Sequence, residues 1–430
     1  MSIGFTFTGK VKKPEALVAS AKKLAEERRY GLSSWDPMKE NALNISLCPL
    51  GGLIQMSWRK EGGLFGQWAV EGCCYSTPAG PGLHKAAVEA LDGLGIQKLA
   101  VEDETEYFQH RDFDRMLREH FHPWLKTLVE MSCQKISEGD CAQMCLCWDL
   151  DSYMPEDVPG TVVTPVGRFS AQRLREIAET QGVEAMAERF FLWYHPGKRD
   201  ALYDRQVALN LLWELCYFAP SSRHEEDASM NKTICDNLEM AAKLDPSLPL
   251  PRKAYKEVCE LAGRQPALPD GPELEAEFEP GYRKGLVTYS IGPLRLTIPG
   301  LYRYEREQWE GGKGCDMWCD ETSLSPIWRV NGYKMNSGAA AFTPVLADDN
   351  DLTEHEIKGG AIRYGWRECD EGGQTVYQVR AEVITGPSLF VITVTHLEAE
   401  DRPGIVELME KIFAQTQDIE KQTIQAIKEE

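Results

Sequence analysis

The stretch LNISLCPLGGLIQMSWRKEGGLFGQWAVEGCCYS, residues 43–76, predicts three strands at 43–48, 53–60 and 64–76. The turn residues PLGG and EGG separate the three apolar-rich runs. Because connections this short join antiparallel neighbours, the strands should form a meander. A strand at 2–9 and helices near Pro14 and at 83–94 flank it. The whole segment therefore predicts an antiparallel sheet with helices on one face.

The middle of the chain is predicted to be mainly helical. Broad apolar faces recur between residues 170 and 263, and residues 111–130 carry another helical pattern. Residues 141–154, which include Cys147, alternate like a strand. Residues 263–285 are rich in proline, glycine and acidic residues, and this composition is typical of a linker.

Beyond the linker the pattern returns to strands. Two of them flank the turn TGPS, residues 385–388, and predict a hairpin. In the first arm, Gln378, Arg380 and Glu382 share the face that we expect to meet solvent. An apolar stripe at helical spacing predicts a closing helix on this sheet: Ile405, Leu408, Met409, Ile412 and Phe413.

Together these patterns predict an α+β fold. It would contain an N-terminal antiparallel sheet with helices, a central helical segment, and a C-terminal antiparallel sheet with a closing helix. The expected division is an N-terminal α+β domain at 1–165, a helical segment at 166–265, a linker at 266–285 and a C-terminal α+β domain at 286–430. The length supports several domains, since a domain commonly has about 100–200 residues.

Composition and charge narrow the classes of partner. Of the 430 residues 43% are hydrophobic, and 67 acidic against 47 basic residues give a formal charge of −20. This charge repels phosphate backbones and anionic lipid, so we expect no nucleic acid and no membrane partner, but a protein partner of basic character. The first residues show no secretory signal, and the 13 cysteines are scattered, which favours reduced thiols and a cytoplasmic protein.

The segment TPAGPGLHKAAVEAL, residues 77–91, is a candidate ligand site. Its Gly-Pro-Gly elbow leads into a helical pattern, and the N–H groups of a helix start attract anions. Gly80, Gly82, His84 and Lys85 are therefore candidate ligand-binding or partner-binding residues. The spacing differs from a phosphate-binding P-loop, and Ala86 offers no hydroxyl for a magnesium ion. A tight strand-to-helix corner is the favoured interpretation.

Histidines and thiols follow no recognised metal-binding pattern. Residues 110–122 hold three histidines and two aspartates without H-E-x-x-H, and the arginines between them indicate a solvated helix face. Cys315 and Cys319 form C-x-x-x-C, but the chain contains no C-x-x-C pair. We therefore expect no metal ion and no cofactor. We also expect no catalytic residue, since no local motif reveals one.

Aromatic residues crowd the C-terminal part of the chain. Trp309 and Tyr333 lie there, together with three tryptophans that we treat as candidate partner-binding residues: Trp318, Trp328 and Trp366. Exposed tryptophan beside polar loops is typical of interfaces, whereas packed tryptophan in a sheet is equally common.

Two functions remain open at this point. The charge and the lack of a reaction motif favour an acidic cytoplasmic protein that binds or neutralises a protein partner, as an immunity protein does, without catalysis. The alternative is an enzyme whose Cys, His or metal site is assembled from distant segments.

Overall fold

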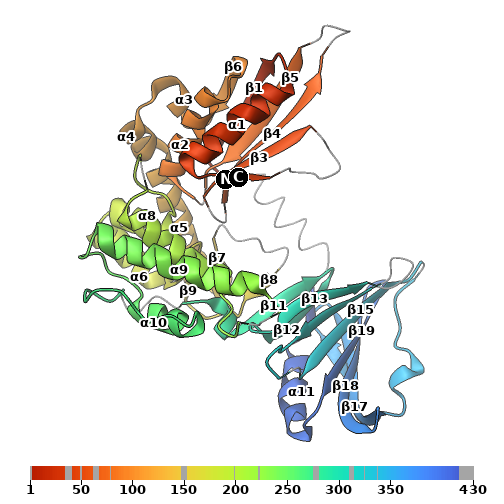
Figure 1. Ribbon diagram of the computed structural model, residues 1–430. Coiled ribbons are helices and arrows are strands. Elements are labelled where there is room, and N and C mark those ends of the chain that lie inside the picture. The colour runs from red at the N-terminus through yellow and green to blue at the C-terminus, as the bar shows by residue number, and fades with distance from the viewer. Residues whose placement is uncertain are drawn as a thin grey trace. The chain divides into compact units, whose positions relative to one another are not determined.

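The computed structural model describes residues 2–33, 41–48, 51–61, 67–77, 79–146, 153–197, 199–220, 223–274, 280–308, 314–323, 325–336 and 338–415. Their contacts define two compact units (Figure 1). The first comprises residues 1–148, 157–216 and 228–281, and the second comprises 149–156, 217–227 and 282–430. The α+β class is confirmed, including its central helices and closing helix. The expected four-part division into domains stays a prediction about independent folding.

A six-stranded sheet lies in the first unit. Its strands are β1 (Gly4–Val11), β2 (Gly31–Ser33), β3 (Ala42–Cys48), β4 (Gly51–Lys60), β5 (Trp68–Tyr75) and β6 (Gln97–Asp103). They follow the order β2-β3-β4-β5-β1-β6, and every neighbouring pair is antiparallel. Strands β3, β4 and β5 form the predicted meander. Residues 49–50 and 62–66, where parts of the predicted PLGG and EGG turns fall, lie outside the described residues.

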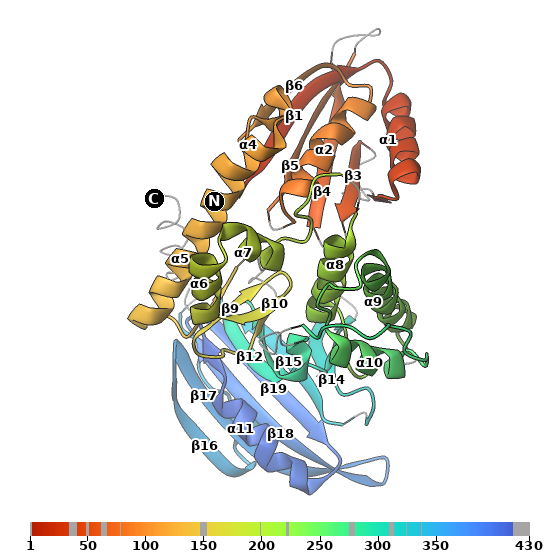
Figure 2. The same ribbon diagram turned by 90° about the vertical axis from the view of Figure 1, so that its left-hand side faces the viewer.

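Two helices pack on one face of this sheet, as the sequence predicts (Figures 1 and 2). They are α1 (Pro14–Arg28) and α2 (Pro81–Gly93), and each begins with proline. Proline suits a helix start because the first N–H groups have no partner within the helix. Leu17 and Ala21 of α1, and Leu83 and Leu91 of α2, are buried against the sheet side, where apolar burial stabilises the layer.

The rest of the first unit is mostly helical. Its helices are α3 (Tyr107–His110), α4 (Phe113–Met116), a π-helical turn (Leu117–Phe121), α5 (His122–Glu138), α6 (Ala171–Thr180), α7 (Val183–Phe190), α8 (Ala201–Glu214), most of α9 (Glu225–Leu244) and α10 (Arg252–Leu261). A small sheet contains β7 (Gln143–Cys145), β9 (Thr161–Thr164) and β10 (Gly167–Ser170). Residues 201–213 of α8 are buried on all sides, so α8 forms the centre of this helical layer. The strand predicted at 141–154 includes β7, and its residues 147–152, Cys147 among them, lie outside the described residues.

Two antiparallel sheets make up the second unit. One has the order β20-β12-β11-β8 and is formed by β8 (Tyr153–Pro155), β11 (Leu286–Ile291), β12 (Leu294–Pro299) and β20 (Phe413–Ala414). The other has the order β13-β14-β15-β19-β18-β17-β16. Its strands are β13 (Arg303–Gln308), β14 (Gly314–Cys319), β15 (Ile327–Lys334), β16 (Asn350–Ile357), β17 (Gly360–Glu371), β18 (Gln374–Thr385) and β19 (Ser388–His396).

The larger sheet contains the predicted hairpin, and the predicted closing helix packs against this sheet. Strands β18 and β19 pair from Tyr377 with His396 down to Thr385 with Ser388, which closes the turn at the predicted residues. Helix α11 (Arg402–Glu410) packs against β18 and buries Ile405, as Figures 1 and 2 show. The apolar stripe therefore predicted the helix and its buried residues Ile405 and Met409, but Ile412 and Phe413 lie beyond its end, and Phe413 belongs to strand β20.

The prediction that one face of β18 meets solvent is wrong. Gln378 is buried, and the Glu382 side chain is ion-paired with Arg363 at 2.7 Å. The backbone N–H of Thr343 donates to Glu382 at 3.0 Å, so this loop covers the face. Period-two alternation shows which residues share a face, but not which distant segment packs on it.

Within the described ranges, no helix combines the length and the apolar character that crossing a bilayer requires.

Candidate functional site

A cavity of about 690 Å³ lies within the second unit. Its walls come from four strands and two flanking segments, and aromatic and charged side chains dominate the lining: Tyr153, Tyr217, Arg283, Tyr289, Tyr304, Arg306, Asp316 and Trp318. Cavities of roughly 300–1,000 Å³ lined by aromatic groups and a few polar groups commonly hold small molecules. We call it the arginine–tyrosine cavity.

Strand pairing places the aromatic groups of the cavity together. Tyr304 of β13 lies opposite Trp318 of β14 in the sheet register, and their rings are 5.2 Å apart between centroids. Tyr289 of β11 lies opposite Tyr153 of β8, and the Tyr289 ring is 5.2 Å from that of Trp318. Opposite residues on antiparallel strands point to the same face, so the register determines this wall.

Arg283 supplies the buried positive charge of the cavity, and Arg306 adds an exposed one. Its guanidinium lies over the Tyr217 ring at 4.0 Å, and Nη1 donates to the carbonyl oxygen of Gly300 at 3.4 Å. The residue is 8% exposed, and no carboxylate forms an ion pair with it in the part of the chain that the structure describes. Arg303 lies over the same Tyr217 ring but is ion-paired with Asp227. The two arginines therefore differ in whether their charge is balanced.

Three buried polar atoms of the cavity residues make no hydrogen bond to any described residue. They are Arg283 Nε, Tyr289 Oη and Trp318 Nε1. Burial raises the pKa of the Tyr289 hydroxyl, so the hydroxyl stays protonated at neutral pH and can donate. Arg283 and Trp318 partly offset this effect on the pKa because their donors face the Tyr289 oxygen, and all three groups can also donate to a ligand that carries acceptor oxygens.

One of the predicted tryptophans, Trp318, lines this cavity, and the other two do not. Trp328 is fully buried and lines a separate cavity of about 350 Å³ beside α11. Trp366 is half-buried, donates from Nε1 to Asp351 at 2.7 Å, and has the Arg402 guanidinium 3.9 Å above its ring. Trp309 lies outside the described residues. A partner-binding role for Trp328 and Trp366 stays a prediction.

The two elbow glycines pack against residues 191–195. Gly80 has φ +113°, and a Cβ there would lie 2.8 Å from the Trp193 carbonyl oxygen. The Gly82 N–H donates to that same oxygen at 2.9 Å, and the Trp193 N–H donates to Ala79 at 2.7 Å. The chain's own backbone therefore occupies part of the helix start, as a tight corner requires. Binding of a ligand at the elbow stays a prediction.

Gly82 and Lys85 also line a cavity of about 560 Å³ in the first unit, together with Trp193 and Arg199. Lys85 is ion-paired with Glu89 one helical turn along α2, so its charge is already balanced. Arg28 and Arg29 line the same cavity beside Glu27 and Glu89, so its lining carries charges of both signs.

His84 is buried at the centre of a polar network in the first unit. Its Nδ1 is 2.7 Å from Ser76 Oγ, and its Nε2 is 3.2 Å from Asp103 Oδ1 and 3.1 Å from Thr105 Oγ1. Burial by itself would raise the pKa of Asp103. The hydrogen bond and charge of His84 and the N–H groups of Phe108 and Thr105 outweigh it and lower this pKa to about 2.

This network contains the residue types of a nucleophilic triad, but its geometry is that of a structural network. Ser76 and His84 are 0% exposed, and neither lines one of the cavities described above. A nucleophile must reach its substrate, so these side chains stabilise the corner between β5, α2 and β6.

Four of the described cysteines show little thiolate character. Burial raises the pKa of Cys48 and of Cys145 to about 11. It also raises the pKa of Cys315 and of Cys319, the C-x-x-x-C pair. Because the thiolate is the reactive form, these four thiols are poor nucleophiles at neutral pH.

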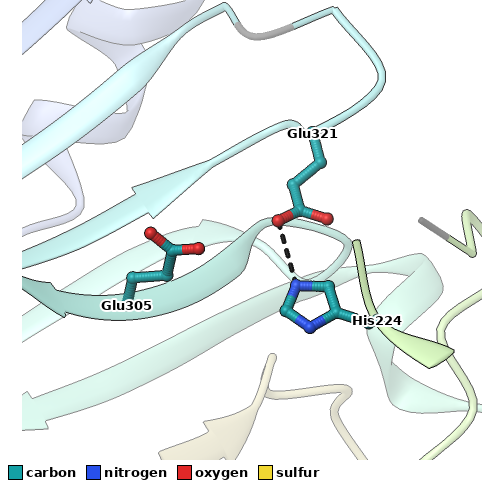
Figure 3. A group of neighbouring side chains, drawn as sticks. All are labelled: His224, Glu305 and Glu321. Carbon is teal, nitrogen blue, oxygen red and sulfur yellow. Dashed lines mark hydrogen bonds and ion pairs between the residues drawn. The ribbon is translucent and has the colours of Figure 1, made fainter. Parts of the chain in front are cut away.

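A second group of side chains in the second unit could hold a metal ion (Figure 3). His224 precedes α9, Glu305 lies on β13, and Glu321 follows β14. Their ligand atoms all lie within 4.8 Å of one another, and His224 Nε2 is 3.0 Å from Glu321 Oε1. The sequence prediction missed this group because its members come from three distant segments with no local spacing.

Comparison with known proteins adds little to this geometry. No family model and no curated protein matches the chain. A solved structure from Bacteroides thetaiotaomicron VPI-5482, determined at 1.50 Å resolution, is similar to 29% of the chain at 15% identity and a TM-score of 0.24. The match spans 46% of that chain, which is less than half its length. A similarity this low supports no inference about fold or function.

Proposed function

We propose that the second unit binds a small molecule that carries a carboxylate or phosphate group beside an aromatic or other flat apolar body. The observation that carries this proposal is the buried guanidinium of Arg283, which lacks a carboxylate partner among the described residues and lines a cavity of about 690 Å³. A buried charge is stable when it is paired, so an anionic group that enters the cavity would be stabilised there.

The rest of the cavity suits the apolar body of such a ligand. Tyr153, Tyr289 and Trp318 provide ring surfaces on which a flat group can stack. Asp316 adds a carboxylate to the lining, and Tyr304 donates from Oη to its Oδ1 at 2.8 Å. The combination favours binding over catalysis, because it positions and balances a charge, and no cysteine or histidine stands among the described lining residues.

The test measures, by isothermal titration calorimetry, the affinity of the full chain for phenyl phosphate and for benzoate. Benzyl alcohol serves as the uncharged analogue. We expect saturable binding of the anions and at least tenfold weaker binding of the alcohol. Replacement of Arg283→Met should weaken anion binding by about 10–100-fold, because hydrogen bonds to charged groups contribute about 1.5–3 kcal/mol each.

The matched control is Arg367→Met. Arg367 also lies in the second unit, donates to Gln378 at 3.0 Å, and does not line the cavity. The variants must keep the circular dichroism spectrum of the wild type. Equal binding of anion and alcohol, or an Arg283→Met protein that binds like the wild type, would contradict the proposal.

A second candidate function is the one that the charge predicts, binding of a basic protein in the cytoplasm. The observation in its favour is β16, an edge strand that exposes Asp351, Glu354 and Glu356 to solvent. An edge strand has unpaired backbone groups, and its acidic side chains attract a cationic partner. Together with a net charge of −20, this edge would select against anionic surfaces.

This second function is tested with a labelled polylysine peptide at several salt concentrations. The double variant Glu354→Lys with Glu356→Lys should bind roughly tenfold more weakly, since each exposed ion pair contributes up to about 1 kcal/mol. The control, Glu130→Lys with Glu138→Lys on α5, has the same net charge and leaves β16 intact. Equal weakening in both double variants would show that only the overall charge matters.

A further inference from the structure

The group formed by His224, Glu305 and Glu321 has the donor atoms of a metal site. It offers one imidazole nitrogen and two carboxylate oxygens, all within 4.8 Å of one another. Figure 3 shows the three side chains, with a dashed line between His224 and Glu321. Ligands about 2.1 Å from a tetrahedral ion lie about 3.4 Å apart, and His224 Nε2 is already 3.0 Å from Glu321 Oε1. Glu305 is 37% exposed, so rotation of its side chain can bring its oxygen to the same distance.

A fourth residue orients the imidazole. Glu226 Oε1 lies 3.2 Å from His224 Nδ1. When Nδ1 donates its proton to a carboxylate, the lone pair of a neutral imidazole is on Nε2, which here faces Glu321. This carboxylate–histidine arrangement is the one that orients metal-binding histidines. The positioning residue is therefore present in addition to the three ligands.

Arg223 shows that the two carboxylates attract a cation. Its guanidinium lies 3.7 Å from Glu321 and 3.9 Å from Glu305. The Glu321 side chain is only 4% exposed, so its negative charge needs a positive neighbour. Arg223 itself is 58% exposed, and its long side chain can turn into solvent when a metal ion takes over this role.

We propose that His224, Glu305 and Glu321 bind a divalent first-row transition-metal ion, with zinc as the preferred physiological member of this class. Imidazole and carboxylate ligands suit zinc, whereas magnesium and calcium prefer an all-oxygen site. Three protein ligands leave at least one coordination position for water. The site is separate from the arginine–tyrosine cavity, whose lining contains none of the three ligands.

The experiment titrates zinc chloride into the chelator-treated full chain and measures binding by calorimetry and metal analysis. The wild type should bind one zinc ion at this site, and zinc should raise its unfolding temperature. Glu321→Gln and His224→Ala should weaken this binding more than 100-fold. Glu226→Gln should weaken it by about 10–100-fold, as loss of a residue that orients a ligand does. Arg223→Gln should strengthen it severalfold, because a competing cation is removed.

The matched control is His355→Ala. His355 also lies near a carboxylate, with Nε2 3.2 Å from Glu410 Oε2, but it belongs to no three-ligand group among the described residues. This variant should bind zinc like the wild type. Because the chain has 13 cysteines, cobalt(II) is used to identify the ligands, and the site should show no thiolate-to-cobalt charge-transfer band.

Three results would overturn the proposal. One is a wild-type protein that binds no zinc. Another is a folded Glu321→Gln or His224→Ala variant with unchanged affinity. The third is a cobalt spectrum dominated by thiolate ligands, which would place the metal on cysteines instead. Circular dichroism of each variant separates loss of binding from loss of folding, and the isosteric Glu321→Gln change keeps the test valid if His224→Ala does not fold.

Discussion

Alanine at position 80 is expected to destabilise the protein by about 3 kcal/mol or more. Gly80 has φ +113° and ψ −177°, a backbone conformation that essentially only glycine adopts. A Cβ at this position would also lie 2.7 Å from the Phe191 side chain and 2.8 Å from the Trp193 carbonyl oxygen. The backbone strain and the overlap add, because both act on the corner that joins the sheet to α2.

The measurement is urea unfolding of Gly80→Ala followed by circular dichroism, with Gly93→Ala as the control. Gly93 ends the same helix, and a Cβ there would meet only Leu24 at 3.8 Å. The control should be neutral or more stable by up to about 1 kcal/mol, because alanine favours helix more than glycine does. Similar unfolding midpoints for the two variants would show that the elbow does not depend on glycine at position 80.

Replacement of Asp103→Ala is expected to destabilise the protein by about 3 kcal/mol at neutral pH, since hydrogen bonds to a charged group contribute about 1.5–3 kcal/mol each. The change leaves His84, Thr105 and the Phe108 N–H without their shared acceptor in a buried site. Three rings surround the imidazole, of which Phe5 is the nearest at 5.5 Å, so water cannot easily replace the carboxylate.

The pH dependence provides the check on Asp103. Its pKa is lowered to about 2 in the folded protein, whereas an unfolded aspartate has a pKa of about 3.9. A lowered pKa stabilises the fold above the unfolded value, and this stabilisation is lost as the pH falls from about 4 towards 2. The difference in unfolding free energy between wild type and Asp103→Ala should therefore shrink over this interval. A difference that is constant from pH 6 to pH 2 would mean that the Asp103 charge contributes nothing.

Local patterns in the sequence were sufficient to predict the main elements of the fold. The meander at 43–76, the TGPS hairpin and the stripe around Ile405 are encoded by neighbouring residues, whose periodicity directly reflects one buried face. The solvent-facing prediction for Glu382 failed because the covering residue, Thr343, comes from a distant loop.

Of the residues that line the candidate site, the sequence singled out only Trp318, as a candidate partner-binding residue. Arg283 lies in the stretch whose composition predicts a linker, and Tyr217 follows the buried helix α8 in the middle of the helical segment. Their contact depends on the tertiary fold, which no short-range spacing records. The same holds for His84. The elbow motif made it a candidate ligand-binding residue, whereas the fold surrounds it with Ser76 and Asp103.

The second unit is built from three separate stretches of the chain, which determines how it can be produced without the first unit. Residues 149–156 and 217–227 belong to this unit although the chain continues into the first unit between them and beyond. A recombinant fragment that starts at residue 286 would lack strand β8, Tyr217 and Arg283, and with them three cavity walls. The lining of the arginine–tyrosine cavity runs from Tyr153 to Trp318 of β14. During synthesis the cavity therefore cannot form until β14 has emerged from the ribosome.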